Sequence, residues 1–289
     1  MSLKNLSVKI KIPKFFEDKL NNKKINQIYK KFAKSLDINI NTNFAVAVSG
    51  GADSLALAFL SKIYSINKSL KPKFFIVDHK LRSESTKEAR AVKRLLKKNN
   101  INSEILTWKG KKPSKNIQSL ARLKRYELLF KQCDKFKIKN ILLGHHQDDL
   151  LENFFIRILR GSGLKGLISL DKKVQVGNKF LIRPLLDQKK EDLAFLSKDV
   201  FKFYFQDPSN DDLKYQRIKI RKLILYLKMN GMNKNKFLKT INNLKYSNEV
   251  VNFYVKENLK KNTSFLIKSN KLILNELFFK QPYEVLFRA

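Results

Sequence analysis

The sequence predicts an α/β fold, in which a parallel doubly wound sheet is followed by a smaller, mainly helical and basic C-terminal domain. Short apolar runs typical of buried strands alternate with segments of helical periodicity over the first half of the chain. A glycine-containing turn, Ser49–Ser54, joins the first of these runs to the helix that follows it. Such alternation builds right-handed βαβ units, whose strands lie parallel.

The predicted elements follow one another in a regular order. The spacing of Ile25, Ile28 and Phe32 predicts a helix over 22–36 that leads into the first strand. Strands are expected at 44–48, 73–77, 103–107 and 140–143, with helices between them over 53–65, 85–98 and 117–136. Later elements are helices over 148–159 and 189–198, a hairpin over 174–185, a helix ending near 261, and a small hairpin at 265–268 and 271–274.

The charge of the chain points to a polyanionic partner. The chain has 289 residues, 43% of them hydrophobic, which is enough for a full core. Its net charge is +36, from 61 Lys and Arg against 25 Asp and Glu. A biased genome or an anionic lipid surface could account for this charge, but nucleic acid is the favoured partner.

Cysteine content and hydropathy limit the location of the protein. Cys133 is the one cysteine, so an intrachain disulfide is impossible and a cysteine-based zinc or iron–sulfur site is disfavoured. No run of 18 apolar residues predicts a transmembrane helix, and the N-terminus lacks the apolar core of a signal peptide. We therefore expect a cytoplasmic protein with no membrane partner.

The turn with the sequence S-G-G-A-D-S is the strongest indication of a binding site. Gly50 and Gly51 leave backbone N–H groups free at a helix N-terminus, a geometry that binds phosphate. The turn has no lysine, so it is not the G-x-x-x-x-G-K-[ST] loop. Asp53 would repel phosphate unless Mg²⁺ bridged them; otherwise it interacts with the helix dipole. The predicted nucleotide contacts are Ser49, Gly50, Gly51, Ala52, Asp53 and Ser54.

A second polar segment follows the second predicted strand. Asp78 and His79 lie there, at the edge where parallel sheets bind ligands. Ser83 or Ser85 with Glu88 could form a helix cap, but a cap requires neither Asp78 nor His79. We therefore predict that both contribute to the nucleotide site.

A basic pair lies on the third predicted helix. Arg122 and Arg125 share one helical face by their i,i+3 spacing. A solvated basic face is an equally simple interpretation. The functional interpretation is a pair of cations near the nucleotide or its acceptor.

Residues 143–153 hold the densest group of titratable side chains. His145, His146, Asp148, Asp149 and Glu152 fall within eight positions. Each aspartate shares a helical face with Glu152. The spacing fits neither the H-E-x-x-H zinc motif nor a two-carboxylate glycosidase pair. Carboxylates that hold Mg²⁺ or an ammonium substrate, with the histidines near the nucleotide, are the better interpretation.

Together the motifs resemble a known family. The chain contains, in order, S-G-G-x-D-S, V-D-H-x-L-R-x-E-S (77–85), A-R-x-x-R-Y (121–126), L-G-H-H-x-D-D (143–149) and R-x-x-R-G-S-G-L-x-G-L (157–167). R-P-L-L (183–186) and D-P-S-N-D-D (207–212) follow. This order resembles the bacterial tRNA(Ile)-lysidine synthetases of the ATP-pyrophosphatase or PP-loop superfamily, over about residues 44–221.

The resemblance implies an adenine nucleotide α-hydrolase-like PP-loop domain and a ligase reaction. ATP would adenylate the wobble cytidine of a CAU-anticodon isoleucine tRNA, releasing diphosphate. Free L-lysine would then displace AMP from C2, giving lysidine and changing codon reading from AUG to AUA. The implied catalytic residues are Asp53, Arg122, His145, Asp148, Asp149 and Glu152, with Asp78 and His79 at ATP and Mg²⁺ at Asp53 and Asp148.

Two domains are predicted. The first, 1–213, is the ATP-binding catalytic domain with a helical lead-in over 1–40, and the second, 214–289, is the basic tRNA-binding domain. Residues 213–248 contain ten Lys and Arg and no acid. The helix begun near Pro282 stops early, so our hypothesis is that the natural chain continues past Ala289. A homodimer is compatible with the sequence. The tRNA contacts are expected at Arg157, Arg160, Arg217, Lys219, Arg221 and Lys222.

The chain departs from the family pattern at two places. Asn153 stands where the family usually has Thr, and 217–221 lacks the Asn of the usual R-N-x-I-R segment. Neither change touches the phosphate loop. The second affects the detail of the expected tRNA contact.

Other functions remain open at this point. Another PP-loop tRNA-modifying enzyme, such as a thiolase, generally uses paired cysteines or an iron–sulfur cluster, which Cys133 alone cannot supply. A non-catalytic RNA-binding protein would carry a decayed site, whereas Gly50, Gly51, Asp53 and Asp148 are intact. A ligase for small metabolites is disfavoured by the net charge of +36.

Overall fold

The computed structural model describes residues 13–110, 117–205, 216–266 and 270–289. The chain divides into two compact units. Unit 1 comprises 1–150 and 171–212, and unit 2 comprises 151–170 and 213–289. The predicted turn at 207–212 and the predicted domain boundary near 214 lie outside the described residues.

Unit 1 is built on a six-stranded sheet in the order β3-β2-β1-β4-β6-β5. Each pair of neighbours is parallel except the edge pair β5 and β6. The predicted parallel sheet is confirmed, and it is larger than the four strands expected, because the predicted hairpin adds β6 alongside β4. The strands are β1 (Phe44–Val48), β2 (Lys73–Asp78), β3 (Ser103–Thr107), β4 (Asn140–Leu142), β5 (Lys173–Val176) and β6 (Lys179–Ile182).

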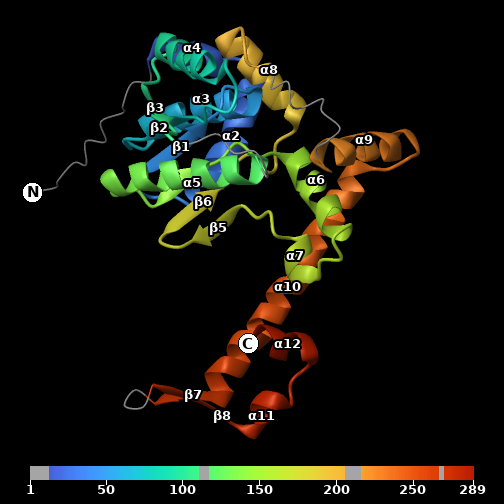
Figure 1. The fold of residues 1–289 in the computed structure, drawn as a ribbon. Helices are drawn as coiled ribbons and strands as arrows, with labels where there is room; N and C mark the ends of the chain where they lie inside the picture. Colours follow the sequence, from blue (N-terminus) through green and yellow to red (C-terminus); the bar gives the residue numbers. More distant parts are fainter. Residues whose placement is uncertain (1–12, 111–116, 206–215, 267–269) are drawn as a thin grey trace, which may run out of the picture. The chain divides into compact units, whose positions relative to one another are not determined.

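Both faces of this sheet are covered by helices. Successive residues of a strand point to opposite faces, so Phe44 and Val46 join one buried cluster while Ala45 joins another. Figure 1 shows α3, α4 and α8 on one side of the sheet and α5 on the other. The helices of unit 1 are α1 (Lys14–Leu20), α2 (Lys23–Asp37), α3 (Ala52–Asn67), α4 (Ser85–Lys98), α5 (Ile117–Lys135) and α8 (Lys190–Phe201).

The helices predicted for residues 22–201 are all present, with ends shifted by no more than three residues. These helices could be predicted from the apolar periodicity because their sequences are strongly amphipathic. In α2, for example, Ile25, Ile28 and Phe32 are buried. Asn22 caps this helix by accepting hydrogen bonds from the backbone N–H groups of Lys24 and Ile25. Among the described residues, no helix is long and apolar enough to span a membrane.

Unit 2 is arranged along one long helix, α10 (Lys234–Asn262), which contacts α7, α11 and α12. The described part of the basic stretch 213–248 is divided between two helices, because Gly231, with φ of +87°, turns the chain between them. The remaining elements are the second half of α6 (Gln147–Ile158), α7 (Leu164–Leu167), α9 (Gln216–Met229), the antiparallel pair β7 (Thr263–Leu266) and β8 (Lys271–Leu274), α11 (Glu276–Phe279) and α12 (Tyr283–Arg288).

Candidate active site

The turn between β1 and α3 is organised by one hydroxyl group. Ser54 Oγ accepts hydrogen bonds from the N–H groups of Ser49 (3.1 Å) and Gly50 (3.0 Å) and donates to Gly51 O (2.9 Å). The first hydrogen bond of α3 runs from Leu55 N to Gly51 O. The N–H groups of the first turn of α3 therefore have no intrahelical partner and are available to an anion. Ser54, predicted to contact the nucleotide, shapes the turn.

Two glycines allow close packing around this turn. Gly50 has φ of +91°, and a Cβ there would lie 2.4 Å from Val92 Cγ2. A Cβ on Gly144 would lie 3.3 Å from the backbone of Asp53. The segment after β4 consequently rests directly on the start of α3, which brings the two strongest predicted motifs together at one edge of the sheet.

His146 connects these two motifs. It precedes α6, and its Nδ1 accepts a hydrogen bond from Asp148 N (3.2 Å) while Asp149 Oδ2 accepts one from His146 N (2.9 Å). This reciprocal arrangement is a capping box, with His146 in the role of the capping residue. The imidazole is thereby fixed with Nε2 only 3.4 Å from Asp53 Oδ2.

The protonation of His146 follows from these contacts. Because Nδ1 accepts a hydrogen bond, the proton of the neutral ring lies on Nε2 and faces Asp53. Burial lowers the pKa of His146, but the hydrogen bond to Asp53 and the charges of Asp149 and Asp148 outweigh it, so the pKa is raised. The sequence prediction chose His145, which is half-buried. The helix start that distinguishes the two histidines was predicted one residue too late.

The carboxylate of Asp53 fits a Mg²⁺ ion that is shared with a phosphate. Its Oδ1 is buried and accepts no hydrogen bond among the described residues. In the part of the chain that the structure describes, no group of three or more His, Cys, Asp or Glu could hold a metal by itself. Mg²⁺ is commonly held by one or two carboxylates together with substrate phosphates, which is the arrangement that Asp53 at the start of α3 can supply.

Asp78 joins β2 to the start of α4. It is 2% exposed, and its Oδ1 accepts hydrogen bonds from Lys80 N (3.0 Å) and Ser85 Oγ (2.9 Å). Thr86 Oγ1 donates to Oδ2 at 2.7 Å. Burial raises the pKa of Asp78, but these hydrogen bonds outweigh burial and lower it. The carboxylate is thus used in positioning the loop that carries the next residue, His79.

His79 and the basic pair of α5 lie at the same edge. His79 is half-buried, and burial together with the charge of Arg125 lowers its pKa to about 4. The ring is therefore neutral at pH 7, and its Nε2 accepts a hydrogen bond from Arg125 Nε (3.3 Å). Arg122 is exposed, with its guanidinium 5.3 Å from the ring centroid of Tyr126.

In unit 2 the structure brings together residues that were predicted to have separate roles. Glu152 is 4% exposed. Its two carboxylate oxygens accept hydrogen bonds of 2.6 Å from Arg217 Nε and Arg221 Nε. These contacts fix α9 to the second half of α6. Arg160 donates to Gln216 Oε1 at 2.8 Å. Of the other predicted tRNA contacts, Arg157 is half-buried and Lys219 and Lys222 are exposed.

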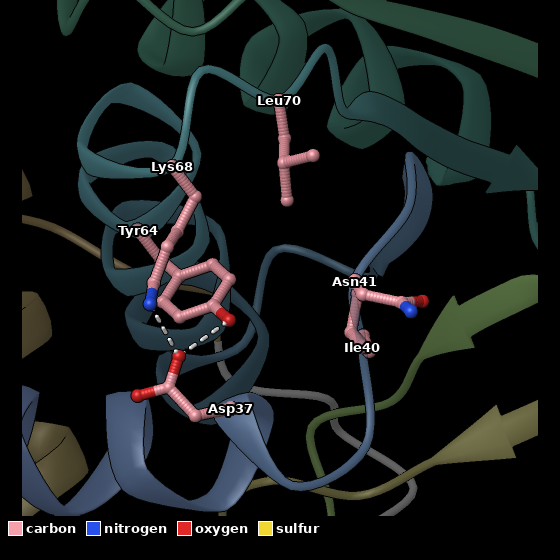
Figure 2. A pocket seen from close by; sticks show the side chains of 6 residues that line it. All are labelled: Asp37, Ile40, Asn41, Tyr64, Lys68 and Leu70. Atoms are coloured by element: carbon pink, nitrogen blue, oxygen red, sulfur yellow. Dashed lines mark hydrogen bonds and ion pairs between the residues drawn. The ribbon is translucent and has the colours of Figure 1, made fainter. Parts of the chain in front are cut away.

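A pocket of about 380 Å³ lies away from this chemistry (Figure 2). There Asp37 Oδ1 accepts hydrogen bonds from Tyr64 OH (2.9 Å) and Lys68 Nζ (2.8 Å). Burial and the hydrogen bond to Asp37 raise the pKa of Tyr64. The pocket is at the C-terminal ends of α2 and α3, whereas the phosphate turn is at the N-terminus of α3, about 24 Å away along the helix. Its lining residues are Asp37, Ile40, Asn41, Tyr64, Lys68 and Leu70.

Comparisons with known proteins agree with this geometry. The chain is 43% identical to a tRNA(Ile)-lysidine synthase of Orientia tsutsugamushi (strain Boryong) over 187 residues, which are 64% of this chain and 42% of the relative. It is 40% identical to a tRNA(Ile)-lysidine synthase of Rhodopseudomonas palustris (strain ATCC BAA-98 / CGA009) over 191 residues, 64% of this chain and 54% of the relative. The chain thus spans about half the length of these curated relatives. The resemblance predicted from the motifs is confirmed.

A solved structure shares the fold. The U34-tRNA thiolase NcsA from Methanococcus maripaludis with its [4Fe-4S] cluster matches with a TM-score of 0.65 and 20% identity, over 76% of this chain and 79% of that one. At this identity the likeness concerns the fold alone. The PP-loop domain family matches residues 18–227, a range that contains every predicted site residue. The chain belongs to the PP-loop domain family.

Proposed function

We propose that this chain is the catalytic part of a tRNA(Ile)-lysidine synthase. It uses ATP to adenylate the wobble cytidine of a CAU-anticodon isoleucine tRNA and joins free L-lysine to C2 of that base. The observation that carries this proposal is the identity of 40–43% to relatives of that name, in a chain whose phosphate turn, Asp53 and His146 meet at one edge of a parallel sheet.

The turn Ser49–Ser54 binds the phosphates of ATP in this proposal. Ser54 holds the turn open, and the N–H groups at the start of α3 point toward the anion. Asp53 is the protein ligand of Mg²⁺, with Asp148 as a second candidate. When bound, Mg²⁺ neutralises charge that develops on the departing diphosphate. His146 holds Asp53 in place from the other side of the site.

Lysine attacks as a neutral amine, so a carboxylate must accept a proton. Asp148 and Asp149 are the candidates for this base, and Asp149 also accepts the backbone N–H of His146 in the capping box. Arg122 and His145 are proposed to contact the reacting nucleotide. An anticodon loop presents its bases unstacked at little cost, as chemistry on a base requires.

The basic residues of unit 2 are proposed to bind the tRNA backbone. Lys219 and Lys222 are exposed on α9 and can contact phosphates directly. Arg217 and Arg221 are held by Glu152 but keep 40% and 32% of their side chains exposed. We assign residues 214–289 to a mainly helical tRNA-binding domain, we expect a cytoplasmic location, and a homodimer remains compatible with the chain.

Thiolase chemistry is the alternative, because the fold is shared with a tRNA thiolase. Cys133 is buried, and burial raises the pKa of its thiol to about 12. It is therefore protonated at pH 7 and a poor nucleophile. The single cysteine of this chain gives the thiolase alternative no support.

One assay tests the proposal. The protein is incubated with ATP, labelled L-lysine and a transcript of the CAU-anticodon isoleucine tRNA, with a GAU-anticodon transcript as the matched control. We expect label in the first transcript only, with one AMP formed for each lysine joined. Absence of label, while tRNA-dependent exchange between ATP and diphosphate persists, would retain the enzyme class and exclude lysine ligation.

A further inference from the structure

A buried arginine without an ion-pair partner lies at the ligand-binding edge of the sheet. Arg183 directly follows β6 and is 4% exposed. Its Nη1 donates to Asp171 O at 2.7 Å, but its Nε is buried and has no hydrogen-bond partner. Among the described residues, no carboxylate forms an ion pair with Arg183. A guanidinium removed from water without a carboxylate in ion-pair contact is costly, and a ligand whose carboxylate pairs with Arg183 would lower this cost.

The surroundings of Arg183 define the kind of ligand. The charges of Arg122, Asp171 and Asp149 all act on the guanidinium of Arg183, although neither carboxylate forms an ion pair with it. The guanidinium of Arg122 lies 5.3 Å from the ring centroid of Tyr126. An anion is favoured next to the arginines, and a cation is favoured next to Asp149.

The position of Arg183 in the sheet separates it from the triphosphate. The phosphate turn follows β1, whereas Arg183 follows β6, two strands away in the order β1-β4-β6. Neighbouring strands lie about 4.8 Å apart, so the two sites are roughly 10 Å apart across the sheet. A phosphate of an RNA chain cannot easily reach a side chain that is 4% exposed. A small free molecule with a carboxylate can.

We propose that Arg183 binds the α-carboxylate of the free L-lysine substrate. A guanidinium matches a carboxylate with two parallel hydrogen bonds, and the unpartnered Nε of Arg183 provides one of the donors. Asp148 and Asp149 lie on the side of the site that favours the ammonium groups. This inference rests on the proposed function and adds the residue that distinguishes an amino acid from a simple amine.

The test compares lysine with 1,5-diaminopentane, which has the same amines and no carboxylate. With the unaltered protein, we expect KM for 1,5-diaminopentane to exceed that for lysine by about tenfold to a hundredfold. In Arg183→Gln, KM for lysine should rise by the same factor and KM for the diamine should not change. Arg183→Lys keeps the positive charge but loses the two parallel donors of the guanidinium, so its KM for lysine should lie between those of the unaltered protein and Arg183→Gln. Arg90→Gln, on the exposed face of α4, is the control.

Measurements with ATP and with tRNA show whether Arg183 binds a phosphate instead of the lysine carboxylate. Arg183→Gln should leave KM for ATP, tRNA affinity and tRNA-dependent ATP–diphosphate exchange unchanged. Loss of exchange or of tRNA affinity with an unchanged KM for lysine would overturn the proposal and assign Arg183 to a phosphate. If Arg183→Gln does not fold, the test uses the unaltered protein alone. Equal KM values for lysine and 1,5-diaminopentane would then overturn the proposal. Incorporation of neither amine, with exchange intact, overturns the proposed function as well.

Discussion

The two units differ in how completely they bury their apolar side chains. Unit 1 encloses a sheet between two helical layers, and its central residues Phe44, Ala45 and Val46 are fully buried. Of the twenty-five large apolar side chains exposed among the described residues, nineteen lie in unit 2. Unit 2 therefore gains less from hydrophobic burial for each residue that it orders. The phosphate turn and His146 thus lie in the more completely buried unit, and we predict that unit 2 is the less stable.

The largest expected effect separates chemistry from tRNA binding. Asp53→Asn removes the carboxylate proposed to hold Mg²⁺, so tRNA-dependent ATP–diphosphate exchange should fall by at least about a hundredfold. tRNA affinity, measured by filter binding, should stay within about twofold. Asp199→Asn is the matched control, because its side chain is 31% exposed against 30% for Asp53. Equal loss of exchange and of tRNA affinity would show that Asp53 is needed for the folded structure and not specifically for the reaction.

The stability of unit 1 should depend on Gly50. Gly50→Ala combines a positive φ with a contact of 2.4 Å to Val92 Cγ2, so we expect about 2–4 kcal/mol of destabilisation by urea unfolding. Adding Val92→Ala should recover part of this loss, since it removes the contact and leaves the backbone strain. Gly177→Ala is the control, because Gly177 has φ of +58° and meets nothing within 4 Å. Similar losses at both glycines would exclude the packing explanation.

Asp78 should make unit 1 sensitive to acid. Its pKa is lowered in the folded state, so its contribution is present above the unfolded pKa of about 3.9 and is lost as pH falls through the folded pKa. Asp78→Asn should destabilise the protein by about 1–3 kcal/mol at pH 7. The difference from the unaltered protein should shrink below about pH 4. Urea midpoints measured from pH 7 to pH 3 test this, and a difference that does not change with pH would contradict it.

The smallest effect tests the role of unit 2. Replacing both Lys219 and Lys222 by Ala should weaken tRNA binding by about fivefold to tenfold and lower the slope of log affinity against log salt by about 1.5. ATP–diphosphate exchange at saturating tRNA should be unchanged. Lys93 and Lys97, exposed on α4 of unit 1, provide the control pair with the same loss of charge. An equal effect of the control pair would mean that net charge alone binds tRNA.

Local sequence patterns predicted the helices and strands well, but they did not predict which strands pair. The helix over 85–98 has the predicted ends because its amphipathic face is encoded within fourteen residues, although the cap expected from Ser83 or Ser85 with Glu88 is not formed. The hairpin at 174–185 was also recognised from its turn, but its pairing with β4 was not. Strand pairing depends on residues some forty positions away, and no local pattern specifies it.

The same limit explains the site residues. His146 was passed over because only the start of α6 decides which of two adjacent histidines faces Asp53. Arg183 was seen as part of a motif, yet its lack of an ion-pair partner among the described residues is visible only in the folded chain. Glu152 was grouped with the aspartates of α6 by its spacing, whereas in the structure it binds Arg217 and Arg221.

Local sequence patterns were sufficient to predict the parallel sheet and the position of the phosphate turn, because apolar periodicity and glycines at a strand-to-helix junction act over a few residues. The family was recognised from the order of its motifs. Tertiary structure decided which atoms of those residues are available. It assigned Ser54 to the turn and Asp78 to the loop after β2, left Nε of Arg183 without a partner, and set His146 against Asp53. The contact between His146 and Asp53 is fixed by packing between distant segments, about which residue spacing carries no information.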